Sequence, residues 1–311
     1  MIKLAKKLVM NLKHPNVLSL FDGISCGRIA LERLGITPAN YFASEIDKFA
    51  IKCTQTNYPD TIQLGDVRGV GKALLEPYDI DILFAGSPCQ GFSHAGKQLN
   101  FEDDRSKLFF EFIRILKEVK PSYFLLENVR MKKEWQDVIS SYVGVEPVLI
   151  NSSLVSAQHR QRLYWTNIPN IKQPEDRGLV LVDILEDREI TSISESYLQY
   201  ALTAKFKYDR PICLPLKARC LISSNQKLYK FPNGIYRKLT PLECERLQTI
   251  PDGYTAMLSN TQRYKTLGNG WTVGVRLSDD YGVSITREKS KGCLSPLIFL
   301  RLKYLSLINF H

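Results

Sequence analysis

The sequence predicts an α/β protein with a doubly wound, parallel sheet and a smaller second domain, and three observations support this prediction. Short apolar runs that suit buried strands alternate with helical patterns up to about residue 166 of the 311-residue chain. After residue 169 the alternation stops, and short polar runs with proline replace it. The composition, 44% hydrophobic and 24% charged, is that of a soluble globular protein with a sizeable core.

The predicted strands and helices follow one another in a regular order. Residues 16–21 form an apolar run that predicts a buried strand, followed by a glycine turn and a helix that Gly35 is placed to end. Residues 41–44 predict the second strand, and Asp47 can cap the helix after it. Further strands are expected at 79–84, 123–126, 145–150 and 163–166, with a strongly amphipathic helix at 108–119.

Positive charge is concentrated in the second region. The chain has 42 Lys and Arg against 32 Asp and Glu, a net charge of +10, and residues 197–240 hold nine Lys or Arg against the single acid Asp209. Such a surface suits a polyanion such as nucleic acid, or an anionic membrane. We predict that this region is a small basic domain of irregular β character at 169–238.

Several classes of protein are disfavoured by the same counts. No apolar run reaches the roughly 18 residues that a membrane-spanning helix needs. The seven cysteines contain no C-x-x-C pair, which argues against a zinc site and against a secreted disulfide framework. We therefore expect no bound metal and a reducing compartment, the cytosol or nucleoid.

Polar residues at the ends of the first strands indicate a nucleoside ligand. The first strand runs into Asp22-Gly23-Ile24, a glycine turn that allows a ligand to approach the backbone and the next helix. Glu45 follows the second strand, where ribose hydroxyls are held in such folds, and Asp66 could accept a hydrogen bond from an adenine amine. The order of these features favours a nucleoside more than any one of them alone.

A cysteine and a carboxylate are placed to carry chemistry. Cys89 lies in a Gly/Ser-rich loop directly after the strand at 79–84, which makes it a candidate nucleophile. Glu127 ends the strand at 123–126 and is expected at the same edge of the sheet. Arg160 and Arg162 share a side in extended chain and could reach the same site.

Taken in chain order, these motifs resemble the DNA cytosine-5 methyltransferases that use S-adenosylmethionine. The most specific part is Pro-Cys-Gln at 88–90 followed by Glu-Asn-Val at 127–129, and the matches extend from about residue 16 to 275. The resemblance implies a Rossmann-like methyltransferase sheet in a catalytic domain of 14–168 together with 239–275, a target-recognition domain at 169–238, and a separate tail at 276–311. The tail at 276–311 departs from the family pattern, which has an apolar helix after the Gly-Asn-Gly at 268–270.

The resemblance also implies a role for each site residue. Cys89 would attack carbon 6 of cytosine, Glu127 would hold ring nitrogen 3 and the exocyclic amine, and Arg160 and Arg162 would contact the base carbonyl. The base must be flipped out of the duplex, because a side chain cannot reach it inside the stack. Cofactor contacts are implied for Phe21, Asp22, Gly23, Ile24, Glu45, Ile46, Asp66, Val67, Pro88, Asn269 and Thr272. DNA contacts are implied for Gln90, Ser93, Lys97, Arg105, Lys217, Arg219 and Arg237.

Two other functions stay open from the sequence. The atypical tail keeps a catalytically impaired DNA-binding or cofactor-binding protein as one alternative. A tRNA cytosine-5 methyltransferase is the other, although the residues that follow Cys89 resemble the DNA enzymes. For the main interpretation we expect double-stranded DNA as partner, no membrane, a monomer with a homo-oligomer as the alternative, and a bacterial or phage protein of the cytoplasm.

Overall fold

The computed structural model describes residues 12, 14–87, 104–169, 171–186, 196, 199, 212–213, 216–223, 227–231 and 234–277. Side chains are described over the same residues, apart from those of 104–106, 212–213 and 276–277. Within these ranges no helix has both the length and the hydrophobicity to cross a bilayer. Most of the predicted tail lies outside the described residues.

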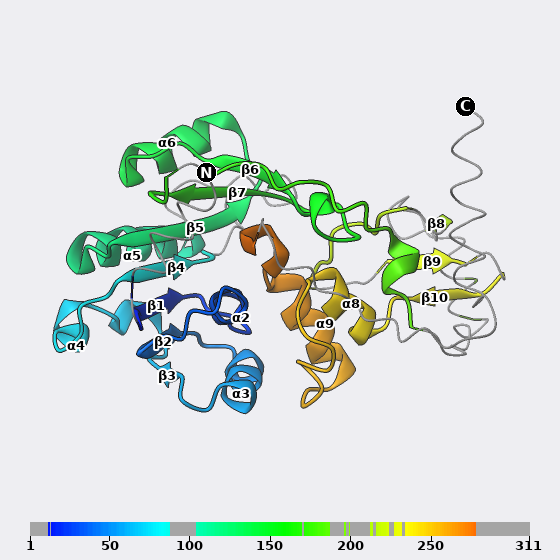
Figure 1. Cartoon of the computed structure of the whole chain (residues 1–311), viewed down its shortest axis with the longest axis horizontal. Coiled ribbons are helices and arrows are strands. Elements are labelled where there is room, and N and C mark those ends of the chain that lie inside the picture. The colour runs from blue at the N-terminus through cyan, green and yellow to red at the C-terminus, as the bar shows by residue number, and fades with distance from the viewer. Residues whose placement is uncertain are drawn as a thin grey trace.

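A seven-stranded sheet forms the centre of the molecule, with strand order β3-β2-β1-β4-β5-β7-β6 (Figure 1). The strands from β3 to β5 pair in parallel, which confirms the predicted doubly wound α/β fold. The strands are β1 (Asn16–Leu20), β2 (Asn40–Ser44), β3 (Ile62–Gln63), β4 (Ile82–Ala85), β5 (Tyr123–Val129), β6 (Val148–Asn151) and β7 (Gln161–Thr166).

One strand, β7, departs from the parallel pattern. β7 lies between β5 and β6 and is antiparallel to both. The physical reason is the short connection between β6 and β7, residues 152–160, because a parallel return needs a crossover of about a dozen residues or more. This insertion places β7 directly beside the strand that carries Glu127.

Helices cover both faces of the sheet, so neighbouring residues of one strand enter two different cores. Val17 and Ile82 pack into the first core, whereas Leu18 and Leu83 pack into the second. Strands buried on both faces have no polar alternation, which explains the continuous apolar runs of the sequence. The helices are α2 (Cys26–Arg33), α3 (Lys48–Asn57), α4 (Lys72–Leu75), α5 (Asp104–Val119), α6 (Lys133–Val143), α8 (Pro241–Leu247) and α9 (Asn260–Asn269).

The chain returns to the first core after the basic region. Leu239, Leu247 and Leu267 belong to the same buried cluster as Val17 and Ile29 of the first βα unit. The segment from Leu239 to Leu267 therefore shares a core with the N-terminal half of the chain. The same cluster contains Leu181, Ala218 and Tyr229, so the basic region also packs onto this core, and the division into one unit of 14–168 with 239–275 and another of 169–238 stays a proposal.

The basic region contains a small sheet of short strands. Its order is β10-β9-β8, with β9 (Leu228–Lys230) antiparallel to β10 (Tyr236–Lys238) and parallel to β8 (Ile212–Cys213). Figure 1 shows this sheet at the opposite end of the molecule from α4 and α5, with α8 and α9 between the two sheets. Helices α8 and α9 thus join the two parts of the protein.

Candidate active site

The turn after β1 contains backbone in the left-handed region, and only one of its three left-handed residues is a glycine. Phe21, Gly23 and Ser25 all have positive φ angles, of 55°, 60° and 56°. Glycine adopts this conformation freely, whereas Phe21 and Ser25 hold it under strain. Backbone strain of this kind is found where surrounding contacts fix a functional loop. The turn leads directly into the N-terminus of α2.

Glu45 fixes this turn against the end of β2. One carboxylate oxygen accepts a 2.8 Å hydrogen bond from the backbone N–H of Gly23, and the other accepts 2.8 Å bonds from Ile46 and Asp47. Beside this carboxylate in the chain, the side chain of Ile46 is 73% exposed, and Phe21 is half-buried. An oriented carboxylate with exposed apolar surface nearby fits a ribose and a purine ring. The residues present therefore suit a nucleoside cofactor.

Asp22 faces the interior and holds the turn together. Its carboxyl group accepts hydrogen bonds from Ser25 Oγ and from the hydroxyl of Tyr41, the latter at 2.9 Å. Burial raises the pKa of Asp22 to about 6, although its hydrogen-bond partners act in the opposite direction. The side chain thus shapes the turn, and any cofactor contact of Asp22 falls to its backbone.

Asp66 lies at the surface and is engaged with a neighbouring cation. Its carboxylate caps the short helix at 67–69 and pairs with the guanidinium of Arg68. These hydrogen bonds lower the pKa of Asp66 to about 2. Asp66 is therefore ionised at neutral pH, and an adenine amine would share it with Arg68.

Glu127 and Arg162 form an ion pair across two adjacent strands. Glu127 lies on β5 and Arg162 on β7, and Arg162 Nε is 2.9 Å from Glu127 Oε1. Their side chains are only 10% and 15% exposed, so the pair is largely removed from water. A charged hydrogen bond of this kind is stronger than a neutral one and fixes the direction of both groups. The carboxylate is thus presented in a defined orientation at the edge of the sheet.

The loop that holds Cys89 starts beside this ion pair. Asn128, the residue after Glu127, donates a 3.1 Å hydrogen bond to Ser87 Oγ, and both side chains are buried. Ser87 lies two residues before Cys89 in the chain. Five predicted site residues, Pro88, Cys89, Gln90, Ser93 and Lys97, lie outside the described residues, as does the side chain of Arg105.

Arg160 is placed differently from the expectation that it contacts the base. It is 3% exposed, and its guanidinium donates to the backbone carbonyls of Leu221 (2.9 Å), Gly268 (3.2 Å) and Gly270 (2.9 Å). The reason is that β7 begins at Gln161, so Arg160 precedes the strand and the two-residue alternation does not apply to it. Arg160 therefore joins three distant segments, whereas Arg162 faces Glu127.

Asn269 and Thr272 lie close to these carbonyls in the chain. Asn269 is exposed at the end of α9, between the two glycines that Arg160 binds. Thr272 is buried, and its hydroxyl donates a 2.9 Å hydrogen bond to Gln248 Oε1. Of the two, Asn269 has the side chain that a ligand can reach.

Two of the basic residues expected on DNA are used inside the protein. Lys217 Nζ donates to the carbonyls of Ser153 (2.6 Å) and Ser156 (3.2 Å). Arg237 forms a buried 2.7 Å ion pair with Glu243. The ammonium group of Lys217 thus binds backbone carbonyls, and the guanidinium of Arg237 binds a carboxylate, so both bind acceptors of the protein itself. Arg219, the third of these predictions, is exposed.

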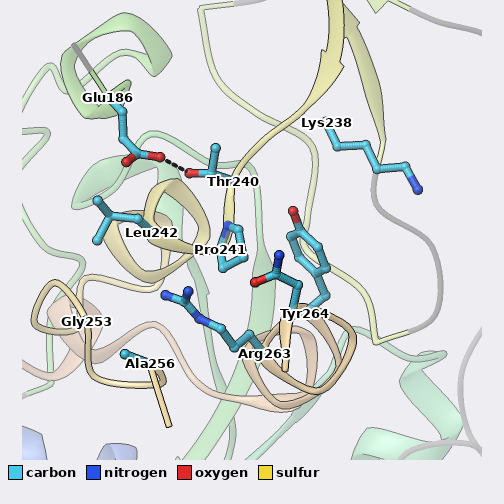
Figure 2. Close-up of a pocket in the computed structure, with 10 residues that line it drawn as sticks. Glu186, Lys238, Thr240, Pro241, Leu242, Gly253, Ala256, Arg263 and Tyr264 are labelled. Carbon is cyan, nitrogen blue, oxygen red and sulfur yellow. Dashed lines mark hydrogen bonds between the residues drawn. The ribbon is translucent and has the colours of Figure 1, made fainter. Parts of the chain in front are cut away.

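A surface pocket of about 490 Å³ lies between α8 and α9 (Figure 2). Several of its polar groups already have partners in the protein. Thr240 donates to Glu186, Arg263 pairs with the buried Glu245 at 2.9 Å, and the hydroxyl of Tyr264 donates to a backbone carbonyl. These bonds hold α8, α9 and the segment before α8 together. The pocket is lined by Glu186, Lys238, Thr240, Pro241, Leu242, Gly253, Ala256, Asn260, Arg263 and Tyr264.

One contributor to the site, Cys220, had no signal in the sequence. Its Sγ lies 3.1 Å from Arg160 Nη1, although 60 residues separate the two in the chain. Gln248, which lies within the stretch of 16–275 that resembles the family, donates to the carbonyls of Leu267 (2.6 Å) and Gly270 (3.0 Å), and Arg160 binds the second of these carbonyls as well. Such long-range contacts follow from the return of the chain to the first core, which residue patterns do not encode.

The model of the C-5 cytosine-specific DNA methylase family matches residues 15–175 and 158–278 of the chain. The chain belongs to this family. Two Type II methyltransferases are each 31% identical to it: M.NlaX of Neisseria lactamica, over 90% of this chain and 97% of that protein, and M.HpaII of Haemophilus parainfluenzae, over 82% and 85%. Membership makes the chain a DNA cytosine-5 methyltransferase and implies the use of S-adenosylmethionine and a DNA substrate.

Solved structures show the same fold at lower sequence identity. The Entamoeba histolytica methyltransferase EhMeth is 19% identical with a TM-score of 0.72, covering 86% of this chain and 96% of that one. The DNMT2 structure from Spodoptera frugiperda is 20% identical with a TM-score of 0.68, covering 84% and 97%. The fold of the C-5 methylase family thus extends over most of this chain.

Proposed function

We propose that this protein transfers a methyl group from S-adenosylmethionine to carbon 5 of cytosine in a specific duplex DNA sequence, through a covalent adduct with Cys89. The observation that carries the proposal is the Glu127–Arg162 ion pair, next to the Asn128–Ser87 hydrogen bond that anchors the start of the Cys89 loop. A carboxylate held in one orientation near a candidate nucleophile is suited to act on a single ring.

The reaction begins with the Cys89 thiolate, which adds to carbon 6 of the flipped-out cytosine. The new C–S bond breaks the aromaticity of the ring and makes carbon 5 nucleophilic. Carbon 5 would then take the methyl group, whose bond to the sulfonium sulfur breaks with the electron pair left on that sulfur. Loss of the carbon 5 proton to a base re-forms the ring double bond and expels the Cys89 thiolate. The addition of Cys89 is thus reversed and the methyl group stays on carbon 5, so the enzyme ends in its starting state.

Glu127 and Arg162 stabilise the electron-rich ring during these steps. Glu127 hydrogen-bonds ring nitrogen 3 and the exocyclic amine, and Arg162 contacts the base carbonyl. Their existing bond keeps both groups oriented before the base arrives, so little reorganisation accompanies the reaction. Arg160, whose guanidinium is bound to backbone carbonyls, supports Arg162 from the neighbouring turn and does not contact the base.

S-adenosylmethionine, when bound, supplies an electrophilic methyl group on its sulfonium. Glu45 binds the ribose hydroxyls, Phe21 and Ile46 cover the adenine, and Asp66 and Val67 flank its amine edge. Gly23 and Ile24 lie along the cofactor through the turn backbone, with Pro88 near the methyl donor. The exposed Asn269 closes the methionine end, and the buried Thr272 supports the backbone there.

DNA lies against the basic region and the loop that contains Cys89. Arg219 is exposed and is proposed to contact a phosphate, whereas Lys217 and Arg237 bind acceptors within the protein. Cationic side chains there offset phosphate charge, and a few others read base edges. Gln90, Ser93, Lys97 and Arg105 are proposed to stabilise the opened duplex, and the enzyme is proposed to act as a cytoplasmic, nucleoid-associated monomer.

Transfer of tritium from methyl-labelled S-adenosylmethionine to nucleic acid tests this function. We expect the full-length protein to label duplex DNA and to leave tRNA unlabelled, and the Cys89→Ala variant to label neither while still binding the cofactor. Labelling of tRNA in place of DNA would establish the tRNA alternative. Cofactor binding by the intact protein without transfer to any acceptor would establish the impaired alternative.

A further inference from the structure

Cys220 is the point at which the basic region meets the two arginines of the site. Its Sγ lies 3.1 Å from Arg160 Nη1 and 3.9 Å from Arg162 Nη2. Arg162 in turn is bound to Glu127. The sulfur atom therefore stands at one end of a connected series of side chains whose other end is the carboxylate proposed to bind the base.

The segment that carries Cys220 is fixed by backbone contacts on both sides. Ala218 forms a parallel bridge with Gln158, donates to the carbonyl of Ala157 (2.7 Å) and accepts from the amide of His159 (2.8 Å). After Cys220, the amide of Leu221 donates to Gln158 Oε1 (3.3 Å). Cys220 thus has a defined position that does not depend on its own side chain.

Close packing restricts this segment further. A Cβ atom added to Gly268 would lie 2.3 Å from the carbonyl carbon of Ile222, so the backbone of α9 touches the segment directly. Because the segment cannot move toward α9, the sulfur is held at the distance from the guanidinium groups that the structure shows. The geometry is rigid enough to orient a neighbouring side chain.

The positive charges of Arg160 and Arg162 explain why a hydrogen-bond acceptor at position 220 is favourable. Arg160 and Arg162 carry like charges, and Glu127 is the carboxylate that Arg162 contacts among the described residues. Arg160 donates to three carbonyls and the sulfur through its two terminal nitrogens, and its buried Nε has no hydrogen-bond partner among the described residues. A polarizable sulfur between the two groups accepts from Arg160 and faces the terminal nitrogen of Arg162, which relieves their repulsion.

We propose that Cys220 is a positioning residue for methyl transfer, which holds Arg162 in the orientation that fixes Glu127. This inference rests on the proposed function. It also links the segment at 217–223, at the edge of the target-recognition region, to the carboxylate that binds the cytosine. A displacement of that segment by incorrect DNA would loosen Arg162 and slow the reaction after binding.

The test uses variants of the full-length protein at position 220 that either remove or keep the side-chain atom that accepts a hydrogen bond from Arg160. We expect Cys220→Ala to lower kcat about tenfold while the KM for duplex DNA and the Kd for cofactor change less than about twofold, because only orientation is lost. Cys220→Ser keeps a small acceptor and should retain kcat within about twofold of the unchanged protein. Ser223→Ala, an exposed hydroxyl on the same segment, is the matched control and should change neither constant.

A double-mutant cycle separates positioning from general structure. In an Arg162→Lys background, which lacks the bidentate group that Cys220 faces, Cys220→Ala should lower kcat no further. The unfolding free energy of Cys220→Ala and Cys220→Ser should be equal within about 0.5 kcal/mol, a difference of about twofold in the folding equilibrium constant. If the alanine variant does not fold, the isosteric pair Cys220→Thr and Cys220→Val makes the same comparison, with Thr active and Val impaired.

Equal kcat values for the acceptor-free and acceptor-bearing variants would overturn the inference, as would a loss confined to KM. Additive effects of Cys220→Ala and Arg162→Lys would overturn it as well. These outcomes can be measured only if the protein with its original sequence methylates DNA. If the unchanged protein transfers no methyl group, the proposed function fails instead, so the two failures are distinguishable.

Discussion

Two regions of the molecule use polar side chains in opposite ways. One is the end of the large sheet that is proposed to bind the cofactor, around Glu45 and Asp66, called the cofactor edge below. The other is the contact region between the two sheets, around Arg160 and Gln158, called the junction below. At the cofactor edge, Glu45 and Asp66 accept hydrogen bonds from nearby residues and keep part of each carboxylate accessible. At the junction, Arg160 and Gln158 are buried and donate to carbonyls from distant parts of the chain. The comparison teaches that partly exposed polar residues at the cofactor edge can bind a ligand. The buried polar residues of the junction instead stabilise the fold on which the cofactor edge depends.

The largest effect is expected at Glu127, the largely buried carboxylate that is proposed to bind the base. Glu127→Gln should lower kcat about 100-fold or more, since the amide cannot supply the same charge to the electron-rich ring. The unfolding free energy should change by less than about 1 kcal/mol, because the amide oxygen still accepts from Arg162. Steady-state methyl transfer and urea unfolding measure the two quantities.

The exposed Glu146 provides the control for that variant, because Glu146→Gln alters a carboxylate that lies 3.6 Å from Lys133 on the surface. It should leave both quantities unchanged, as surface ion pairs contribute little. A Glu127→Gln protein with full activity would remove the base-binding role from this residue.

Arg160→Met tests the junction and should act mainly on stability. It removes the charged donor from the carbonyls of Leu221, Gly268 and Gly270, of which Leu221 keeps the Cys220 thiol and Gly270 keeps the Gln248 amide, and this should lower the unfolding free energy by about 3 kcal/mol. Arg162→Met should lower stability by less, about 1 kcal/mol, and activity by more. Urea unfolding of both variants makes the comparison, and equal stability losses would contradict the division between the two arginines.

A smaller loss is expected from Gly268→Ala at the same junction. Alanine favours a helix by about 1 kcal/mol over glycine, but here its Cβ would meet the backbone of Ile222 and Ser223 within 2.5 Å. We expect the clash to prevail, with a net loss of about 2 kcal/mol in thermal or urea unfolding. Gly69→Ala, where a Cβ meets nothing within 4 Å, is the matched control, and a stable Gly268→Ala protein would show that the junction yields easily.

The smallest effect concerns pH and the buried carboxyl group of Asp22. Its pKa is about 6 in the folded protein and 3.8 in the unfolded reference, so the folded state binds the proton more tightly. Stability therefore falls as pH rises through the interval between these values, by about 1 kcal/mol from pH 5 to 7 for this group. Asp22→Asn should remove this component from the pH dependence of the unfolding free energy, and an unaltered profile would contradict the assignment.

The sequence predicted the local parts of this molecule well, because they depend on neighbouring residues. Asp47 caps α3 through the amide of Phe49, and Gly35 adopts a positive φ of 71° after α2, as their positions indicated. Of the side chains expected at one place, Glu127 and Arg162 form an ion pair, Arg160 binds backbone carbonyls, and Cys89 lies outside the described residues.

The long-range parts could not be predicted in the same way. The antiparallel insertion of β7 depends on a short connection, and the burial of Arg160 depends on where β7 begins. Lys217 and Arg237 belong to a basic region that favoured DNA contacts, yet each has an internal partner set by tertiary packing. A count of charges cannot distinguish a cation that faces solvent from one that satisfies a buried carbonyl or carboxylate.

The most direct measurement of the central claim is the mass of the protein after incubation with S-adenosylmethionine and duplex DNA that contains 5-fluorocytosine at the methylated position. Fluorine cannot leave carbon 5 as a proton does, so the account predicts a stable protein–DNA adduct attached through Cys89 and carrying one added methyl group. Methyl transfer to ordinary DNA with no adduct on the fluorinated duplex, or an adduct on a different cysteine, would contradict it.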